Sequence, residues 1–296
     1  NDSLFFVYDK YDVWEINPSN FFSVKNITQG RSKNEIHRYI RTDDEERFIS
    51  FYNPVWLKAF NEKNKSENLA WLGSQSGKYS LSHFFKNNYI LSSLRKSRDT
   101  PAMILIKESY KESPDLYSSA LMPYVSVGAD QLFGDYNFGT KLSSINPQQK
   151  DYNWGTSELY KWKAFNGKMS EGVLYKPENF DSTKKYPMIM YSNTLHDYID
   201  PTPTGSRLNI SFFVSRGYVV FSPDIHYTTG KQSKNTYDYV VSAAQSLAKK
   251  KWIDGANIGI QGQSWGGIQV AQLITMTDMF KAAWAGAPVA NMTSAY

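Results

Sequence analysis

One serine in this sequence stands among closely spaced glycines, at Gly262-Gln263-Ser264-Trp265-Gly266-Gly267, and the spacing fits the pattern G-x-S-x-G. A serine hydroxyl is a weak nucleophile at neutral pH. Acyl transfer through it needs a base that takes its proton and donors that stabilise the oxyanion formed on the substrate. We therefore predict that Ser264 is a nucleophile held on a sharp turn between a strand and a helix.

The neighbours of Ser264 suit such a turn. Gly262 and Gly266 lack the Cβ atoms that would collide where the backbone passes close to other elements, and Gly267 extends this small-residue stretch. The Trp265 N–H, at the start of the following helix, is the expected first oxyanion donor. The alternative is a structural or phosphate-binding glycine loop, but no reading frame here gives the dinucleotide pattern G-x-G-x-x-G.

The elements around this turn alternate between strands and helices, which predicts a largely parallel sheet. The apolar residues of 236–250 recur at helical spacing and predict one face packed on that sheet. With the motif, this order predicts an α/β-hydrolase domain over residues 151–296. The expected strands are 172–175, 188–192, 218–223, 257–261 and 282–287, and the expected helices are 206–216, 236–250 and 266–276.

Residues 1–150 show a different pattern of short strands separated by turn residues, which predicts an all-β sandwich, barrel or propeller. One segment, 79–95, has a helical pattern of apolar residues instead. The expected strands are 3–8, 13–16, 36–40, 48–52, 68–73, 103–107 and 115–121. The chain is thus expected to form two domains, 1–150 and 151–296.

The partners that an α/β-hydrolase serine requires do not follow it in this chain. The order in that fold is Ser, then acid, then His, yet His37, His83, His196 and His226 all precede Ser264. Asp278 is the one later carboxylate and comes too early. We interpret the histidines as ordinary surface or core residues, with a substrate-loop role for His226 as the alternative. We expect a chain incomplete at both ends, inactive by itself, whose acid and base lie beyond Tyr296.

Composition narrows the partners. The net charge is +5, but residues 1–150 carry 19 Lys and Arg against 17 Asp and Glu, and residues 151–296 carry 14 against 11. Neither half is a basic arm, so no nucleic-acid partner is expected. No apolar run is long enough for a membrane span. The chain has no cysteine, which excludes disulfides and thiol chemistry. A periplasmic or secreted location is suspected, with a cytoplasmic one and a homo-oligomer left open, and no metal or cofactor is implied.

Several further segments give residues 154–296 a resemblance to the prolyl oligopeptidase family of serine peptidases, particularly its dipeptidyl-peptidase-like branch. They are the predicted turn at residues 262–267, which we call the elbow, and residues 171–177, 185–187, 216–220, 252–254 and 287–289. Weaker echoes at 8–14 and 26–30 resemble the last blades of that family's N-terminal β-propeller. The resemblance implies a peptidase that forms an acyl-enzyme on short peptide substrates, with the propeller limiting access.

The resemblance also implies binding residues. The family places a tyrosine six residues after a Tyr-Pro proline as second oxyanion donor, whereas this sequence has Asn193 there, with Tyr191 as the alternative on the same strand face. Trp265, and more weakly Tyr296, match aromatic residues of the substrate pocket. Two rival functions remain: an esterase on the same fold, and a non-catalytic peptide-binding protein of propeller and hydrolase domains.

Overall fold

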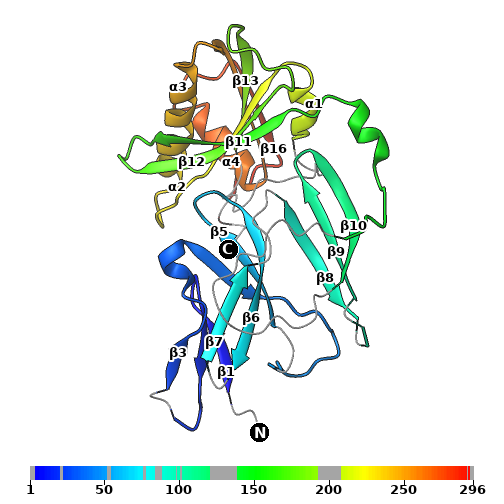
Figure 1. Cartoon of the computed structure of the whole chain (residues 1–296). Coiled ribbons are helices and arrows are strands. Elements are labelled where there is room, and N and C mark those ends of the chain that lie inside the picture. The colour runs from blue at the N-terminus through cyan, green and yellow to red at the C-terminus, as the bar shows by residue number, and fades with distance from the viewer. Residues whose placement is uncertain are drawn as a thin grey trace. The chain divides into compact units, whose positions relative to one another are not determined.

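The computed structural model describes the chain except for residues 1–3, 21–22, 52–54, 76–77, 84–88, 98, 101, 121–138, 193–207, 292 and 294–296. The chain divides into two compact units, Asn1–Asn146 and Pro147–Tyr296 (Figure 1). The described part of the first unit is built from antiparallel sheets. The second unit combines a mixed sheet with helices.

The second unit is organised around a six-stranded sheet of order β11-β12-β14-β13-β15-β16. Strands β14, β13, β15 and β16 are parallel neighbours, as predicted from the alternation of strands and helices. Strand β12 pairs antiparallel with β14, and β11 pairs antiparallel with β12 at the edge of the sheet; β11 was not predicted. The bounds are β11 (Thr156–Lys163), β12 (Met169–Lys176), β13 (Tyr186–Ser192), β14 (Val219–Pro223), β15 (Ile253–Gln263) and β16 (Ala282–Gly286).

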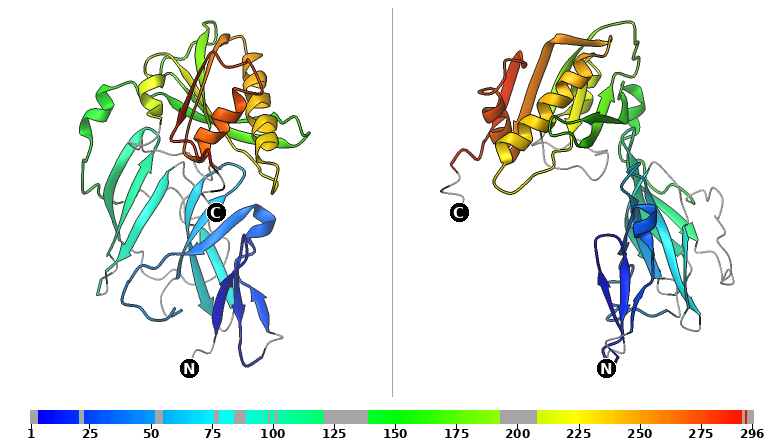
Figure 2. Two further views of the ribbon diagram at one scale, coloured as in Figure 1. Left: turned by 180° about the vertical axis from the view of Figure 1, so that it is seen from behind. Right: turned by 90° about the vertical axis from the view of Figure 1, so that its left-hand side faces the viewer.

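Helices connect the parallel strands of this sheet. A continuous helical segment runs through α2, a π-helical turn η3 and α3, and its apolar stripe of Val240, Val241, Ala244 and Leu247 is buried in the core. Both views in Figure 2 show this segment against the strands. No helix in the described residues is long and apolar enough to cross a membrane. The bounds are α1 (Ile210–Val214), α2 (Gln232–Thr236), η3 (Tyr237–Val241), α3 (Ser242–Ala248) and α4 (Trp265–Leu273).

Strand β14 lies in the centre of the second unit, and every one of its residues is buried. Phe221 is fully enclosed and makes edge-to-face contacts with Tyr160 and Trp162, with ring centroids 5.8 and 5.5 Å apart. Such continuous burial is typical of a strand covered on both faces. A rigid centre of this kind fixes the strand ends, where the chain turns toward helices.

The first unit contains three antiparallel sheets in its described residues, ordered β1-β2-β3, β4-β5-β6-β7 and β10-β9-β8. Short 3₁₀ helices, η1 (Gly30–Lys33) and η2 (Pro147–Asp151), occur before β4 and at the start of the second unit. The strand bounds are β1 (Phe5–Tyr8), β2 (Val13–Ile16), β3 (Val24–Asn26), β4 (Glu35–Tyr39), β5 (Val55–Asn61), β6 (Glu67–Gln75), β7 (Lys78–His83), β8 (Ile90–Lys96), β9 (Ala102–Ser109) and β10 (Glu112–Ala120).

A buried carboxylate joins the two segments of this unit that echo a propeller sequence. Asp12, which is fully buried, accepts a hydrogen bond from the Thr28 hydroxyl (2.9 Å) and another from the Gly30 N–H. The Thr28 hydroxyl in turn accepts from the Val13 N–H at 3.0 Å. These hydrogen bonds between the two segments therefore hold the start of β2 against the chain that follows β3.

Two expectations for the first unit are wrong. Residues 79–95 contain no helix in their described part: they belong to β7 and β8, because Tyr79 and Leu81 alternate onto one buried face. Residues 48–51 form no strand either. Ile49 and Phe51 pack on the same core from a loop, and the strand of this region is β5. In a short segment the spacing of apolar residues can fit both the 3.6-residue period of a helix and the two-residue period of a strand.

Candidate active site

Ser264 stands alone between the end of β15 and the start of α4. Its backbone has φ 56° and ψ −114°, a conformation with positive φ that only glycine adopts without strain. The residue is exposed, whereas Gly262 two positions earlier and Gly266 two positions later are buried. The local backbone thus lifts the serine out of a buried strand and helix, which is the geometry that the motif predicts.

Backbone hydrogen bonds fix this turn. The Ser264 N–H donates to the Gly286 carbonyl at the end of β16 (2.9 Å), and the Ser264 carbonyl accepts from the Ile268 N–H (3.2 Å). The first bond ties the turn to the neighbouring strand, and the second begins the helix. Both peptide groups of the strained residue are held, so its Cα–Cβ bond has a defined direction relative to α4.

The glycines around Ser264 are required by close backbone approach. A Cβ on Gly262 would overlap the Gly266 carbonyl and lie 2.9 Å from the Ser192 carbonyl oxygen. A Cβ on Gly267 would lie 2.5 Å from the Gly286 carbonyl oxygen and 3.0 Å from the Cα of Pro288. These obstacles are backbone atoms that cannot rotate away. The small residues of the motif therefore let β13, β15, α4 and β16 pack together beneath the serine.

The start of α4 provides the electrostatic part of the site. The N–H groups of the first helical turn have no acceptor within the helix and carry the positive end of its dipole. Trp265 is the first residue of α4 and is half-buried, and the first turn contains no acidic residue that would neutralise this end. A negative oxygen forming beside Ser264 would therefore meet a favourable field.

Gln269 is a polar residue of this region that the sequence analysis missed. It lies on the buried face of α4 and is fully enclosed. Its Oε1 accepts from the Ser192 hydroxyl at 2.5 Å, and its Nε2 donates to the Tyr227 hydroxyl. The amide thereby links the end of β13, the helix of the elbow and the loop after β14. A glutamine between the apolar Ile268 and Val270 was the signal that could have revealed it.

The remaining predicted site residues divide into those that can be placed and those that cannot. Tyr191 lies on β13 opposite Gln261 and is 4% exposed. Asn193 and Tyr296 lie outside the described residues. His226 is exposed, with its ring 5.4 Å from that of Tyr239. The binding roles of these residues, and the substrate-loop alternative for His226, stay predictions.

Comparison with known proteins identifies a family and relatives that parts of this chain match. Residues 204–296 match the family model described as the prolyl oligopeptidase family. Dipeptidyl-peptidase 5 of Porphyromonas gingivalis is 30% identical over 148 residues, covering 44% of this chain and 21% of that protein. Human dipeptidyl peptidase 8 is 29% identical over 168 residues, covering 51% of this chain and 18% of that protein. The chain thus matches about a fifth of the length of these relatives.

Solved structures resemble the whole chain. A putative dipeptidyl aminopeptidase IV from Bacteroides ovatus aligns over 97% of this chain and 42% of its own, with 19% identity and a TM-score of 0.66. A prolyl endopeptidase structure aligns over 94% of this chain and 39% of its own, with 14% identity and a TM-score of 0.63. These likenesses confirm the predicted fold class, an α/β-hydrolase domain preceded by propeller-type β-sheets. The match of residues 204–296 to the family model confirms the resemblance to the prolyl oligopeptidase family.

Proposed function

We propose that this chain, which resembles the prolyl oligopeptidase family over residues 204–296, carries the nucleophile of a serine peptidase. The observation that carries the proposal is the exposed Ser264 on a strained turn at the start of α4. Other non-glycine residues with positive φ, such as Gln29 and Asn34, lie in the left-handed region, whereas Ser264 with ψ −114° lies outside it. Strain of this kind is characteristic of functional sites. The names of the relatives, dipeptidyl peptidases, support a peptidase reaction.

In the proposed reaction the Ser264 hydroxyl oxygen attacks the carbonyl carbon of a peptide bond. The hydroxyl proton passes to a base and from it to the departing amine, so that the C–N bond breaks and an acyl-enzyme remains. Water then attacks the acyl carbon. The same base takes a proton from the water and returns it to the Ser264 oxygen, and the acid product leaves. The Trp265 N–H stabilises the oxyanion, a contribution of about 3–4 kcal/mol per donor in such sites. Asn193 and Tyr191 are the candidates for the second donor.

The proposal assigns neither the acid nor the base of the reaction to residues 1–296. All four histidines precede Ser264, and the one later carboxylate, Asp278, is exposed beyond the end of α4. We therefore expect negligible turnover from the 296-residue chain. Substrates are proposed to be short peptides, with Trp265 and Tyr296 as candidate contacts to the side chain before the cleaved bond.

The test is covalent labelling by a fluorophosphonate probe of the gene product that carries this sequence. Ser264→Ala should abolish the label, because no hydroxyl remains to attack phosphorus. Ser215→Ala, which removes an exposed hydroxyl elsewhere in the same unit, should leave the label unchanged. Equal labelling of the wild type and Ser264→Ala would refute the proposal. Absence of any label in a folded wild type would instead favour the peptide-binding alternative.

A second measurement separates a peptidase from an esterase. The same protein, without probe treatment, is assayed with p-nitrophenyl acetate and with Gly-Pro and Ala-Pro anilides. A peptidase should cleave the anilides with a higher kcat/KM relative to the acetate, since its pocket binds the peptide part of the transition state. Cleavage of the acetate alone would support the esterase alternative.

A further inference from the structure

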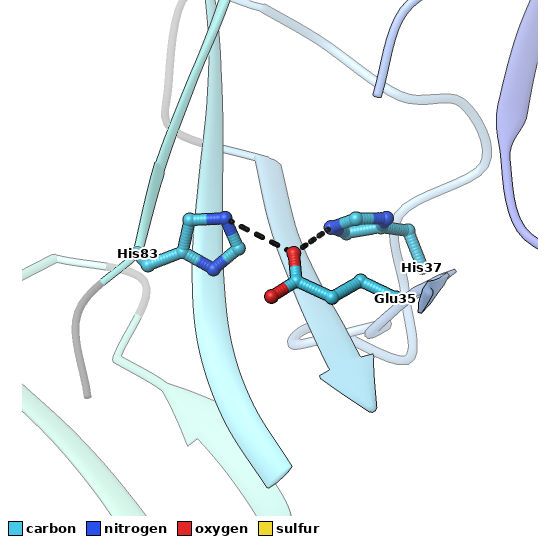
Figure 3. A group of neighbouring side chains, drawn as sticks. All are labelled: Glu35, His37 and His83. Atoms are coloured by element: carbon cyan, nitrogen blue, oxygen red, sulfur yellow. Dashed lines mark ion pairs between the residues drawn. The ribbon is translucent and has the colours of Figure 1, made fainter. Parts of the chain in front are cut away.

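Three side chains of the first unit converge, although they come from two strands, β4 and β7, that are separated by β5 and β6. Glu35 and His37 lie on β4, and His83 lies on β7. The Nε2 atoms of His37 and His83 are 4.0 and 3.7 Å from the same Glu35 oxygen, Oε2. Figure 3 shows both imidazoles directed at this oxygen. We call these residues the Glu35–His37–His83 cluster.

The sheet makes room for this convergence with small residues. His37 is paired with Ala59 on β5, and His83 with Ala70 on β6. Directly opposed residues, and residues two apart on one strand, lie on the same face of a sheet. Ala59 is two residues from Leu57 on β5, and Leu57 is paired with Ala70. The two histidines and the two alanines therefore lie on one face. Both alanines are fully buried. The two imidazoles can therefore extend toward each other across β5 and β6, and their ring centroids are 6.0 Å apart.

Hydrogen bonds do not account for the positions of His37 and of the Glu35 Oε2 atom. The His37 side chain is fully buried, and neither of its ring nitrogens has a hydrogen-bond partner among the described atoms. The buried Glu35 Oε2 likewise has no hydrogen bond there. The distances of 3.7 and 4.0 Å exceed the range of about 2.7–3.2 Å for an N–H···O bond. Buried polar atoms without partners are rare, and an ion bound at this position would satisfy them.

The position of His37 is suited to coordination, because its side chain is fully buried and its Nε2 faces the Glu35 Oε2 (Figure 3). The Gly30 backbone lies so close to the other side of the ring that a Cβ there would be 2.5 Å from Nδ1. This contact fixes the ring with Nε2 toward Glu35.

We propose that the Glu35–His37–His83 cluster binds a divalent transition-metal ion, with Zn²⁺ as the ion that its donors favour. Two imidazole nitrogens and one carboxylate are ligands typical of zinc, at about 2.0–2.2 Å from the ion. The donor atoms of the cluster all lie within 4.8 Å of one another, and tetrahedral zinc requires about 3.3 Å, so modest side-chain rotations complete the site. The fourth position is taken by water.

The consequence is a bridge between the outer strands of the sheet. An ion held by β4 and β7 joins two strands that have no direct backbone pairing in the order β4-β5-β6-β7. The site lies in the first unit, and it does not rest on the function proposed for Ser264. The sequence alone implied no metal, because Glu35-Ile36-His37 by itself is not a metal-binding motif. The fold adds the third ligand, His83 of β7.

The test is zinc titration of the untagged 296-residue chain after EDTA treatment, by calorimetry and elemental analysis. We expect one zinc per chain and a higher melting temperature with zinc, because an ion bound only by the folded state stabilises it. Mg²⁺ should not compete, since it prefers all-oxygen sites. Failure of the wild type to bind zinc at this stoichiometry would overturn the proposal.

Variants identify the ligands. His83→Asn and Glu35→Gln change partly exposed side chains, so their folding can be verified by circular dichroism before titration. Each should weaken zinc binding more than about 100-fold, since loss of an outer-shell partner alone typically costs 10–100-fold. His226→Asn, in the other unit, is the matched control and should bind like the wild type. Unchanged affinity in folded His83→Asn and Glu35→Gln, or equal loss in His226→Asn, would contradict the assignment.

Discussion

The two units of this chain bury their sheets differently. In the second unit one core cluster surrounds the fully buried strand β14, and helices supply much of the apolar cover. In the first unit the alternating residues of β5 point to separate cores: Leu57 belongs to one cluster and Trp56 to another. A parallel sheet covered by helices has no polar face, so its polar chemistry is confined to the turns at strand ends.

The placement of reactive groups follows from this difference. Ser264 is exposed at the end of β15 and is held there by backbone strain. His37 points from the middle of β4 into the interior, beside small residues of the neighbouring strand. An antiparallel sheet can therefore build a polar cluster on its own buried face, whereas the α/β unit displays its nucleophile at a turn.

The largest expected effect tests the single core of the second unit. Phe221→Ala should lower the free energy of unfolding of this unit by about 3–5 kcal/mol, because a fully buried ring with two aromatic contacts is removed. Phe165→Ala, at a side chain 47% exposed, should cost far less. Denaturant unfolding followed by circular dichroism measures both. Equal costs would contradict the description of β14 as the centre of the core.

The next prediction concerns the backbone beneath the serine. Gly262→Ala should destabilise the second unit by about 1–3 kcal/mol and reduce labelling of Ser264, because the new Cβ meets fixed backbone oxygens. Gly255→Ala on the same strand is the control: its Cβ would lie 3.6 Å from that of Ala248, an ordinary contact. Thermal unfolding and probe labelling are the measurements. A tolerated Gly262→Ala would show that the elbow can shift.

A buried carboxylate of the first unit gives a smaller, pH-dependent effect. Burial acts to raise the pKa of Asp115, but hydrogen bonds from Lys141 (2.6 Å), Ser143 (2.7 Å) and the Ile145 N–H (2.9 Å) hold it below its usual value. Asp115→Asn should cost about 1–2 kcal/mol at pH 7.

The sign of the pH dependence follows from that lowered pKa. The ionised carboxylate stabilises the folded state above the pKa of the unfolded chain, near 4, and the contribution is lost as the pH falls through the folded-state pKa. The stabilities of the wild type and Asp115→Asn should therefore begin to converge as the pH falls below about 4 and become equal below the lowered pKa of the folded state. Lys141→Ala, at a half-exposed partner, should cost less than about 1 kcal/mol. A difference that persists in acid would exclude this electrostatic cause.

The smallest effect concerns the strain at the nucleophile. Ser264→Gly should raise the stability of the second unit by up to about 1 kcal/mol, since glycine adopts positive φ without a Cβ penalty. Ser264→Ala keeps the Cβ and should bring no gain. Both variants should lose the covalent label. A stabilised Ser264→Ala would assign the strain to the hydroxyl instead of the backbone.

Much of the fold could be read from short segments. The elbow at Ser264, the parallel strands around it and the apolar stripe of 236–250 were predicted because local backbone sterics and apolar periodicity specify them. The helix expected over 79–95 was wrong. Leu81 and Tyr89 fit a helical period, but they pack in two different cores, Leu81 from β7 and Tyr89 from the bend before β8. In short segments the choice is made by tertiary packing.

The sequence by itself determined that a serine flanked by glycines lies on a tight turn between a strand and a helix, since the glycines let the backbone pass close to its neighbours. Only the tertiary structure decided that Gln269 joins Ser192 to Tyr227 and that His83 reaches Glu35 and His37. The physical reason is the separation along the chain of the residues involved. Turn geometry is fixed by residues that are neighbours in the sequence, whereas these contacts depend on the order of the strands and, for His83, on the small residues of the strands that lie between.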